Sequence, residues 1–387
     1  MTGKPYLPLS EEERERIASV ASSLTDLRKE LRRRIVGQDE VITQVLAAIL
    51  AEGHCLVVGF PGLAKTMLVS SIAELLSLDF KRIQFTPDLM PSDITGTTMI
   101  SDGSSNWGET GRRDFRFLKG PVFTNMLLAD EINRTPPKTQ AALMEAMEER
   151  QVSAAGQRMV LDRPFFVLAT QNPIEQEGTY PLPVSQLDRF LFNITIDYPS
   201  DQEEFRIVVL TTSTYSPQLS QIFHRDQLLE MIRLVHRIEV EPKLLDYASR
   251  IVRSTRPSAK EAPAFTKEFV AWGGGPRATQ ALILGARALA LMSGRHAVAS
   301  DDIHQIAVPT LRHRIILRYH AQAEGIQPEE VVSRLLTQLP DGLYKPPEKA
   351  GGAPSPHERT KRNDGSGLWS SLFLKLKGKK AREGSGR

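Results

Sequence analysis

Cysteine, net charge and long apolar runs are all scarce in this chain. Cys55 is the single cysteine among 387 residues, which excludes an internal disulfide framework and indicates a reducing compartment. No segment approaches the roughly 18 consecutive apolar residues of a membrane-spanning helix, and residues 1–6 lack the apolar part of a signal peptide. A net charge of +3 is too small to demand a nucleic-acid partner. We therefore expect a cytoplasmic protein.

Metal-binding and nucleophile motifs are also missing. The eight histidines form no His-Glu-x-x-His pattern and no zinc-type spacing with the cysteine, and no Gly-x-Ser-x-Gly motif occurs. His313 and His320 fall in an arginine-rich run, and we interpret them as structural or solvated. The apolar fraction of 41% with 25% charged residues is ordinary for a globular protein, and the length suits two domains with tails. The remaining candidate chemistry is phosphoryl transfer.

A phosphate-binding loop is indicated by residues 55–66, which read Cys-Leu-Val-Val-Gly-Phe-Pro-Gly-Leu-Ala-Lys-Thr. An apolar strand leads into a glycine-bearing loop that ends at Lys65 and Thr66. In loops of this layout, backbone N–H groups surround the phosphates, the lysine reaches the β- and γ-phosphate oxygens, and the hydroxyl holds Mg²⁺. Ala64 stands where the common pattern has its second glycine. We expect right-handed helical geometry there, which alanine tolerates. A chance match is the alternative for this motif alone.

Two further polar sites follow apolar strands. Residues 126–129 are apolar and precede Asp130 and Glu131, which places both carboxylates at a strand tip, where open α/β sheets bind ligands. Asp130 would hold Mg²⁺ through water, and Glu131 would polarise the attacking water. Another apolar strand, 164–171, is followed by Asn172, whose amide can orient that water. A solvated acidic turn and an Asn-Pro turn are the alternatives.

Two arginines complete the candidate set. Arg189 lies between apolar neighbours in segment 187–191. It is either an ion-paired residue at the edge of the core or a finger that acts on a neighbouring subunit. Arg277 follows the glycine-rich run 273–276 at the start of a helix. It either contacts bound nucleotide from a second domain or is a basic residue near a helix N-terminus without a ligand.

In combination, these motifs resemble the MoxR family of AAA+ ATPases. The matching segments, in order over roughly residues 30–320, are 35–41, 59–66, 120–123, 128–134, 169–173, 178–183 and 186–190. The resemblance implies an α/β fold with a P-loop parallel sheet and helices on both faces, followed by a small all-helical lid domain. It also implies ATP and Mg²⁺ as cofactors, and alanine is the usual residue of that family at position 64.

The resemblance assigns roles to individual residues. Lys65 and Thr66 would be Walker A, Asp130 and Glu131 Walker B, Asn172 sensor 1, Arg189 the arginine finger and Arg277 sensor 2. The ATP-binding residues would be Val36, Gln38, Gly59, Pro61, Gly62, Leu63, Ala64, Lys65, Thr66, Met67 and Arg277. The catalytic residues would be Glu131, Lys65, Asn172 and Arg189, and the metal-binding residues Thr66 and Asp130.

The chain departs from the family at two places. Segment 101–113 is longer than relatives usually carry, and we interpret it as an extended polar hairpin or loop near the central pore of a ring. Glycines precede Pro276 and Arg277, where the family usually has a small hydroxylated residue. The resemblance therefore assigns no substrate contact within 101–113, and Arg277 follows glycines rather than the family's usual residue.

The alternation of apolar segments and turns predicts four parts: an N-terminal helical arm at 1–34, an α/β core at 35–200, a helical domain at 201–343, and a disordered linker with a basic amphipathic segment at 344–387. The resemblance implies that the second part is the AAA+ ATPase core and the third its lid. Before the lid we expect helices at 11–34, 37–52 and 139–150 and a hairpin at 151–161. In the lid we expect helices at 202–212, 226–237, 242–254, 266–271, 277–293 and 301–319. Glycines and Pro199 near the junction fit a hinge.

The C-terminal segment 368–380 places Leu368, Trp369, Leu372 and Phe373 on one helical face, with most lysines elsewhere. Such a segment can dock on an anionic membrane, which would make the protein peripherally membrane-associated, or in a partner groove. A strand and a disordered basic tail are the alternatives. The family resemblance does not extend to this segment.

The leading functional hypothesis is an ATP-hydrolysing ring that remodels protein partners. Relatives form hexamers and act as chaperone-like assembly or metal-insertion factors, commonly with partners bearing von Willebrand factor A domains. A magnesium-chelatase-like motor subunit is a closely related alternative. A nucleic-acid motor is a second, although the sequence offers no dedicated DNA-binding domain. A non-hydrolysing nucleotide-gated scaffold is a third, and the adjacent Asp130 and Glu131 argue against it.

Overall fold

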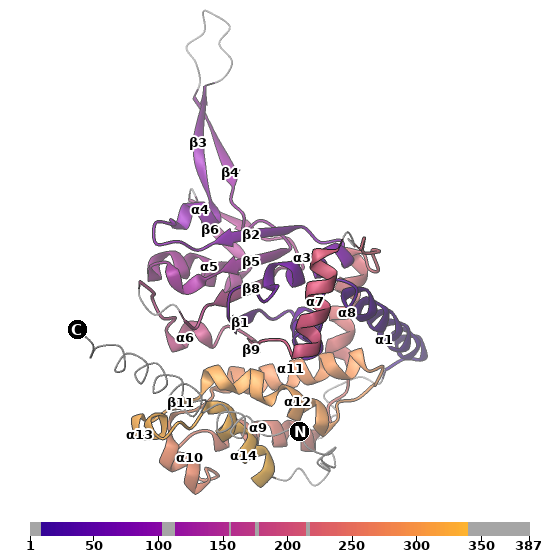
Figure 1. Ribbon diagram of the computed structural model, residues 1–387, viewed down its shortest axis with the longest axis vertical. Helices are drawn as coiled ribbons and strands as arrows, with labels where there is room; N and C mark the ends of the chain where they lie inside the picture. The colour runs from indigo at the N-terminus through magenta and orange to yellow at the C-terminus, as the bar shows by residue number, and fades with distance from the viewer. Residues whose placement is uncertain (1–8, 103–112, 155, 175–177, 214–216, 340–387) are drawn as a thin grey trace, which may run out of the picture. The chain divides into compact units, whose positions relative to one another are not determined.

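A five-stranded parallel sheet forms the centre of the ATPase core (Figure 1). The computed structural model describes residues 9–102, 113–154, 156–174, 178–213 and 217–339. The sheet has the order β2-β5-β8-β1-β9. Its strands are β1 (Cys55–Gly59), β2 (Phe80–Gln84), β5 (Met126–Asp130), β8 (Phe166–Gln171) and β9 (Phe192–Ile196). The parallel order places the carboxyl ends of these strands along one edge, and the predicted α/β class is confirmed.

Two apolar layers cover the two faces of the sheet. Side chains alternate along β1, so that Cys55 and Val57 join one buried cluster and Leu56 joins the other. The first cluster includes side chains of α1 (Glu11–Leu31), α2 (Asp39–Leu50) and α3 (Lys65–Leu75), and the second those of α4 (Pro91–Thr95) and α5 (Pro137–Glu149). Burial on both faces explains why the central strands are continuous apolar runs in the sequence.

The N-terminal helix α1 packs onto the rest of the protein rather than standing alone. It begins with a capping box, in which the Ser10 hydroxyl accepts the N–H of Glu13 at 3.2 Å and the Glu13 carboxylate accepts the N–H of Ser10 at 2.9 Å. Ile17, Leu27 and Leu31 are fully buried in the first apolar cluster. The helix ends at Leu31, three residues before the predicted end.

Two antiparallel hairpins extend from the core. The longer one pairs β3 (Gly96–Asp102) with β4 (Arg113–Lys119) and projects away from the sheet in Figure 1. Gly96 has φ +106°, and a Cβ there would collide with the carbonyl oxygen of Leu118, so glycine is required at the base. Of the segment 101–113, predicted as an extended polar hairpin or loop, residues 103–112 lie outside the described residues, and the strands that flank them pair with each other. The shorter hairpin, β6 (Gln151–Ala154) with β7 (Gln157–Val160), is also as predicted.

Helices dominate the chain from residue 201 onward. They are α7 (Asp201–Thr212), α8 (Arg225–Arg237), α9 (Pro242–Ser254), α10 (Ala264–Phe269), α11 (Pro276–Met292), α12 (Ser300–Leu311), α13 (Tyr319–Ala323) and α14 (Pro328–Gln338). The core also contains the short helix α6 (Val184–Leu187) and the 3-10 helix η1 (Ile132–Arg134). Helix α14 was not among the predicted helices.

The prediction of an all-helical lid is wrong in one detail. Strand β10 (Val270–Trp272) pairs antiparallel with β11 (Ile316–Leu317), so the helix predicted over 301–319 already ends at Leu311. Pro309 in the last turn of α12 has no N–H to donate, and the β-branched residues that follow favour an extended chain. The 3-10 helix η2 (Arg312–Arg314) makes the turn between them.

No helix in the described part of the chain is long and apolar enough to cross a membrane. The amphipathic segment predicted at 368–380 lies outside the described residues.

Candidate active site

The phosphate-binding loop connects β1 to α3, as the sequence predicts. Gly62 has φ +84° and Ala64 has φ +55° and ψ +21°, so both are left-handed. The expectation of right-handed geometry at Ala64 is therefore wrong. Ala64 is the N-cap residue of α3 and directly precedes its first residue, Lys65. The backbone changes direction from the loop into the helix at this position. Glycine would adopt this conformation without strain, whereas alanine adopts it at a cost of about 1–2 kcal/mol.

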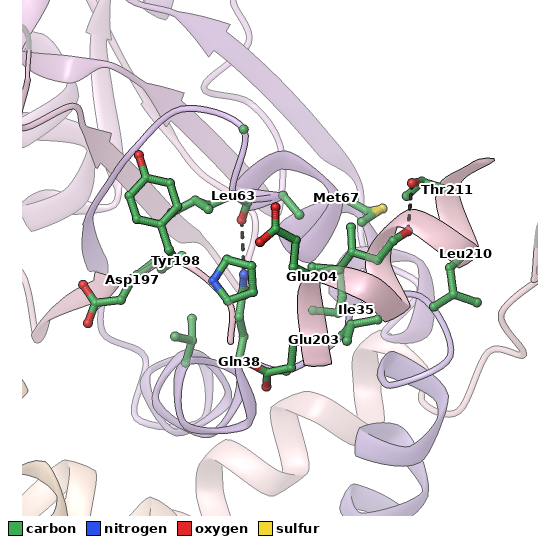
Figure 2. A pocket seen from close by; sticks show the side chains of 18 of the residues that line it. Ile35, Gln38, Leu63, Met67, Asp197, Tyr198, Glu203, Glu204, Leu210 and Thr211 are labelled. Carbon is green, nitrogen blue, oxygen red and sulfur yellow. Dashed lines mark hydrogen bonds between the residues drawn. The ribbon is translucent and has the colours of Figure 1, made fainter. Parts of the chain in front are cut away.

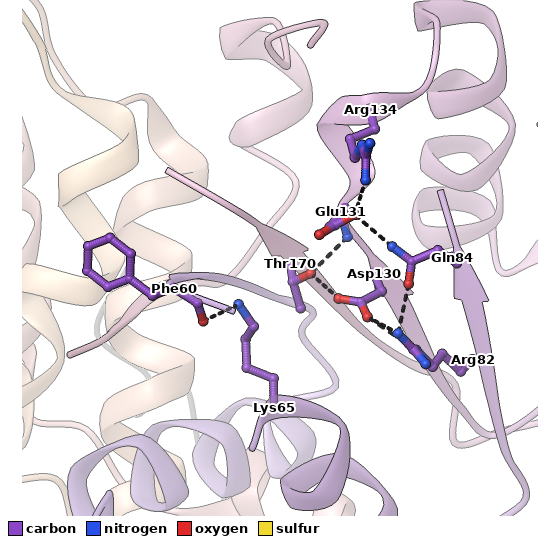
Figure 3. Close-up of polar contacts among 8 residues, drawn as sticks. All are labelled: Phe60, Lys65, Arg82, Gln84, Asp130, Glu131, Arg134 and Thr170. Atoms are coloured by element: carbon purple, nitrogen blue, oxygen red, sulfur yellow. Dashed lines mark hydrogen bonds and ion pairs between the residues drawn. The ribbon is translucent and has the colours of Figure 1, made fainter. Parts of the chain in front are cut away.

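Lys65 folds back onto its own loop in the structure. Its Nζ donates to the carbonyl oxygen of Gly59 at 2.7 Å. It also donates to that of Phe60 at 3.2 Å (Figure 3). Partial burial lowers the pKa of Lys65, while the nearby carboxylates of Asp130 and Glu131 act in the opposite direction. An ammonium group held only by two neutral carbonyl groups can be transferred to phosphate oxygens with a gain in electrostatic energy.

The two carboxylates at the tip of β5 are held by residues of the neighbouring strands β2 and β8 and by Arg134 of η1. Oδ1 of Asp130 accepts the Thr170 hydroxyl at 2.6 Å, and Oδ2 accepts Nη2 of Arg82 at 2.6 Å. Oε2 of Glu131 accepts Nε2 of Gln84 at 2.7 Å and Nη1 of Arg134 at 2.9 Å (Figure 3). Both acids thus face groups that fix their orientation.

Sequence reasoning missed these partners. Arg82 and Gln84 are two positions apart on β2 and therefore point to the same face of the sheet. The alternation of side chains along a strand was the signal in the sequence that places Arg82 and Gln84 on one face. It identifies them as partners of Asp130 and Glu131 only when β2 is known to lie beside β5. Thr170, near the end of β8, was read as part of an apolar strand.

One cavity brings together three of the four predicted catalytic residues, Lys65, Glu131 and Asn172. This phosphate cavity, of about 420 Å³, is lined by Pro61, Gly62, Leu63, Ala64, Lys65, Thr66, Met67, Arg82, Gln84, Asp130, Glu131 and Asn172. Asn172 is buried, and its Oδ1 accepts the N–H of Ile174 at 3.2 Å. The Thr66 hydroxyl and the Asp130 carboxylate are oxygen donors of the kind that Mg²⁺ prefers, and both border this cavity. The donor set therefore fits a magnesium ion.

A second cavity, of about 470 Å³, also borders the phosphate-binding loop (Figure 2). This α7 cavity is lined by residues 34–38, 41, 61–64, 67, 196–199 and several side chains of α7. Gln38 has φ +57°, its Nε2 donates to the Leu63 carbonyl oxygen at 3.3 Å, and its Oε1 is buried without a hydrogen-bond partner among the described residues. An acceptor of this kind suits the amino group of a bound base.

The two cavities share the residues of the phosphate-binding loop from Pro61 to Ala64. An elongated ligand can therefore place phosphates in one cavity and an apolar ring in the other. Of the predicted ATP-binding residues, Val36 and Gln38 line the α7 cavity, and Gly59 contributes the carbonyl group that holds Lys65. Helix α7 falls in the segment predicted to be the lid. Its side chains nevertheless line the α7 cavity, which was not predicted.

Arg189 and Arg277 both form ion pairs with the carboxylate of Glu148, outside the phosphate cavity and the α7 cavity. Nη2 of Arg189 lies 2.7 Å from Oε2 of Glu148, and Nη2 of Arg277 lies 2.5 Å from Oε1 of the same residue. The hydrogen bond from Arg277 and the charge of Arg189 lower the pKa of Glu148. Neither arginine is among the described residues that line the phosphate cavity or the α7 cavity. The structure therefore does not bring Arg277 to the nucleotide site of its own chain.

A buried arginine fixes the segment that carries Arg189. The Arg314 side chain is only 3% exposed, and its guanidinium donates to Oδ1 of Asp188 at 2.7 Å and to the carbonyl oxygens of Phe190 at 2.8 Å and Leu191 at 3.2 Å. His313 beside it is buried against the Phe190 carbonyl, and burial lowers its pKa well below the usual value. The interpretation of His313 as structural agrees with this neutral, buried state.

Comparison with known proteins identifies the family. Residues 54–192 match the model of the ATPase family associated with various cellular activities (AAA), and residues 264–335 match the AAA lid domain. The chain is 44% identical over 307 residues to Chaperone MoxR1 of Mycobacterium tuberculosis, covering 79% of each protein. It is 41% identical over 310 residues to the uncharacterized protein YeaC of Bacillus subtilis, covering 80% of this chain and 92% of that protein.

A solved structure agrees with the sequence relatives. The crystal structure of a protein from Cytophaga hutchinsonii assigned as an ATPase has a TM-score of 0.79 and 36% identity, with 85% of this chain and 98% of that chain covered. Protein MoxR of Methylorubrum extorquens is 29% identical over 329 residues, covering 78% of this chain and 90% of that protein. The chain thus belongs to the MoxR-type AAA ATPases, and it binds and hydrolyses ATP.

Proposed function

We propose that this ATPase is a chaperone-like ring protein that uses ATP hydrolysis to remodel or assemble partner proteins. The observation that carries the catalytic part is the phosphate cavity, which Lys65, Thr66, Asp130, Glu131 and Asn172 all line. The chaperone-like part is supported by the 44% identity to Chaperone MoxR1.

In the proposed reaction, Lys65 leaves the Gly59 carbonyl and binds the β- and γ-phosphate oxygens together with the backbone N–H groups of the loop. Asn172 orients a water molecule toward the γ-phosphorus, and Glu131 accepts the proton of that water as its oxygen attacks. The bond between the γ-phosphorus and the β–γ bridging oxygen breaks, and ADP and phosphate leave. Thr66 and Asp130 would hold Mg²⁺, which neutralises the phosphate charge.

Glu131 must first exchange its present partners. Its Oε2 is bonded to Gln84 and Arg134, so these two donors occupy the oxygen that a water molecule would need as its acceptor. We infer that nucleotide binding loosens these contacts before hydrolysis.

The site is completed by a second subunit in this proposal. Arg189 and Arg277 both lie on Glu148, outside the cavities of their own chain. A face that carries two guanidinium groups against one carboxylate has a net positive charge, which suits the phosphates of a neighbouring subunit. Such a contact joins two different faces, so it generates a ring or an open filament rather than a two-fold dimer, and the family resemblance favours the ring. A hexamer is the size that the family resemblance implies.

The client would be a protein, and partners with a von Willebrand factor A domain are implied by the resemblance, as is insertion of metal cofactors into such partners. The two hairpins are the candidate contact elements, because they expose apolar side chains. Met99 on β3 is 52% exposed and Val160 on β7 is 77% exposed. Exposed apolar residues on projecting hairpins suit transient contact with an unfolded or partly assembled chain.

The test is a trap for the ATP-bound ring. Glu131→Gln should bind ATP and fail to hydrolyse it, so oligomers and clients should accumulate on it in the presence of ATP and Mg²⁺. Lys65→Ala, which removes phosphate contact, is the matched control. A protein recovered from native lysate with the first variant and not with the second supports the proposal. Recovery of nucleic acid that survives moderate salt, with no protein partner, would contradict it.

A further inference from the structure

Arg82 on β2 is a cation resident in the phosphate cavity. Its Nη2 lies 2.6 Å and its Nε 3.1 Å from Oδ2 of Asp130, so two N–H groups of one guanidinium converge on a single carboxylate oxygen (Figure 3). The Arg82 side chain is about half exposed, whereas that of Asp130 is 14% exposed. Arg82 also lines the cavity itself. A cationic side chain thus lies where the proposed function requires a metal ion.

The Asp130 carboxylate is already engaged at both oxygens. Oδ1 accepts the Thr170 hydroxyl at 2.6 Å, and Oδ2 accepts Arg82. Mg²⁺ held by Asp130 through water would need the Asp130 oxygens as acceptors for its bound water molecules. The two Arg82 N–H groups already occupy Oδ2, and the guanidinium would also repel a divalent cation placed beside it. Metal binding and the Arg82–Asp130 ion pair therefore compete.

We infer that Arg82 is a positioning residue that competes with Mg²⁺ for Asp130 and is released toward the phosphates when the metal–nucleotide complex binds. This inference rests on the proposed role of Asp130 in holding Mg²⁺. Without metal, Arg82 neutralises Asp130 beside the adjacent carboxylate of Glu131. With metal, the displaced guanidinium is still on the wall of the cavity that receives the phosphates, where a planar cation binds oxygen anions well.

The release is connected to the catalytic carboxylate through one amide. Nη2 of Arg82 also donates to Oε1 of Gln84 at 2.7 Å, and Nε2 of Gln84 donates to Glu131 at 2.7 Å. Displacement of Arg82 removes the bond that orients the Gln84 amide. The contact from Gln84 to Glu131 then weakens, while Oε2 of Glu131 keeps the bond from Arg134. Release of Arg82 would thus loosen one of the two hydrogen bonds that engage Oε2 of Glu131 before hydrolysis.

The first test measures metal binding without turnover. Mn²⁺, used alone as a paramagnetic probe in place of Mg²⁺, is titrated into the full-length protein. Arg82→Gln should bind Mn²⁺ roughly 3- to 10-fold more tightly than the parent, because a charge-assisted competitor is gone. Lys81→Gln is the control, since Lys81 on the same strand bonds the Phe123 carbonyl at 3.2 Å rather than Asp130. Lys81→Gln removes one positive charge from β2, as Arg82→Gln does, and should leave the Mn²⁺ affinity unchanged.

The second test separates competition from a general loss of charge. In an Asp130→Asn background, Arg82→Gln should no longer improve Mn²⁺ affinity. Arg82→Gln should also weaken ATP binding when Mg²⁺ is present and leave it unchanged in EDTA, because the guanidinium reaches the phosphates only after release. Arg82→Lys, which keeps the charge, should restore part of the Mg²⁺-dependent ATP affinity.

Unchanged or weaker Mn²⁺ binding by folded Arg82→Gln, with an unfolding midpoint close to that of the parent, would overturn the inference. If Arg82→Gln does not fold, the same comparison is made with Arg82→Lys, which loses the paired contact of Nε and Nη2 with Oδ2. Its Mn²⁺ affinity should lie above that of the parent, by less than the roughly 3- to 10-fold expected for Arg82→Gln, because the charge remains. These titrations involve no hydrolysis. They therefore decide the role of Arg82 even if the parent proves unable to remodel any client, and a failed client trap leaves their outcome unaffected.

Discussion

An equal mixture of two inactive variants, Arg189→Ala and Lys65→Ala, should regain ATP hydrolysis. Lys65 lines the phosphate cavity, whereas Arg189 lies on Glu148 at 2.7 Å, on another face of the same chain. When an active site joins the cavity of one subunit to the arginine face of the next, each variant alone lacks one half of every site. A mixed ring contains complete sites wherever an Arg189→Ala subunit presents its cavity to a Lys65→Ala subunit.

The size of the recovery follows from this arrangement. Loss of an arginine finger lowers kcat by about 10³- to 10⁵-fold in related phosphoryl-transfer systems, so each variant alone should be nearly inactive. With random head-to-tail assembly, about a quarter of the interfaces are complete, so about a quarter of parental turnover should return. Loss of the ion pair between Arg189 and Glu148 should not change the expected recovery of turnover. The Arg189 and Glu148 side chains are 29% and 37% exposed, and such a pair contributes only about 0.2–1 kcal/mol to stability.

The assay is phosphate release after the two variants have been mixed under conditions that allow subunit exchange. A mixture of Lys65→Ala with Glu131→Gln is the control, because both residues line the same cavity and no interface can be complete. Turnover that stays at the level of the single variants, in rings shown to contain both, would refute the assignment of Arg189 to a neighbouring site.

Two further predictions concern stability. Burial lowers the pKa of His54 from its usual 6.5 to about 4, so the folded state should lose up to about 3 kcal/mol as pH falls from about 6.5 to about 4. Urea unfolding of His54→Gln should show a flatter pH dependence over that range, and an unchanged slope would contradict the assignment. Ala64→Gly should raise the free energy of unfolding by up to about 1 kcal/mol, because relief of left-handed strain exceeds the added chain entropy. If Ala64 had right-handed geometry, Ala64→Gly would lower the free energy of unfolding by about 1 kcal/mol, and that result would contradict the observed left-handed backbone.

The convergence of the catalytic residues could be predicted from the sequence. Lys65, Asp130 and Asn172 each follow an apolar strand, and the carboxyl ends of parallel strands meet at one edge of a sheet. To apply this rule, one needs to know only which apolar segments are strands and that the sheet is parallel. The order of the strands in the sheet is not needed.

The partners of those residues could not be predicted in the same way. Arg82 meets Asp130 only because β2 lies beside β5, a pairing between segments more than forty residues apart. The left-handed backbone of Ala64 follows from how the loop enters α3, and the inward turn of Arg314 follows from a lid that packs on the core. Each depends on tertiary packing, which overrides the local preference of the residue.

The buried guanidinium of Arg314 has a consequence for cooperativity. It bonds the carbonyl oxygens of Phe190 and Leu191, directly after Arg189, and it belongs to the lid half of the chain. Displacement of the lid must therefore carry Arg189 with it or break several buried hydrogen bonds. In a ring, the lid of one subunit would thereby set the geometry of its neighbour's catalytic site. Occupancy at one site and hydrolysis at the next would be linked, and by thermodynamic reciprocity the linkage in binding affinity runs in both directions.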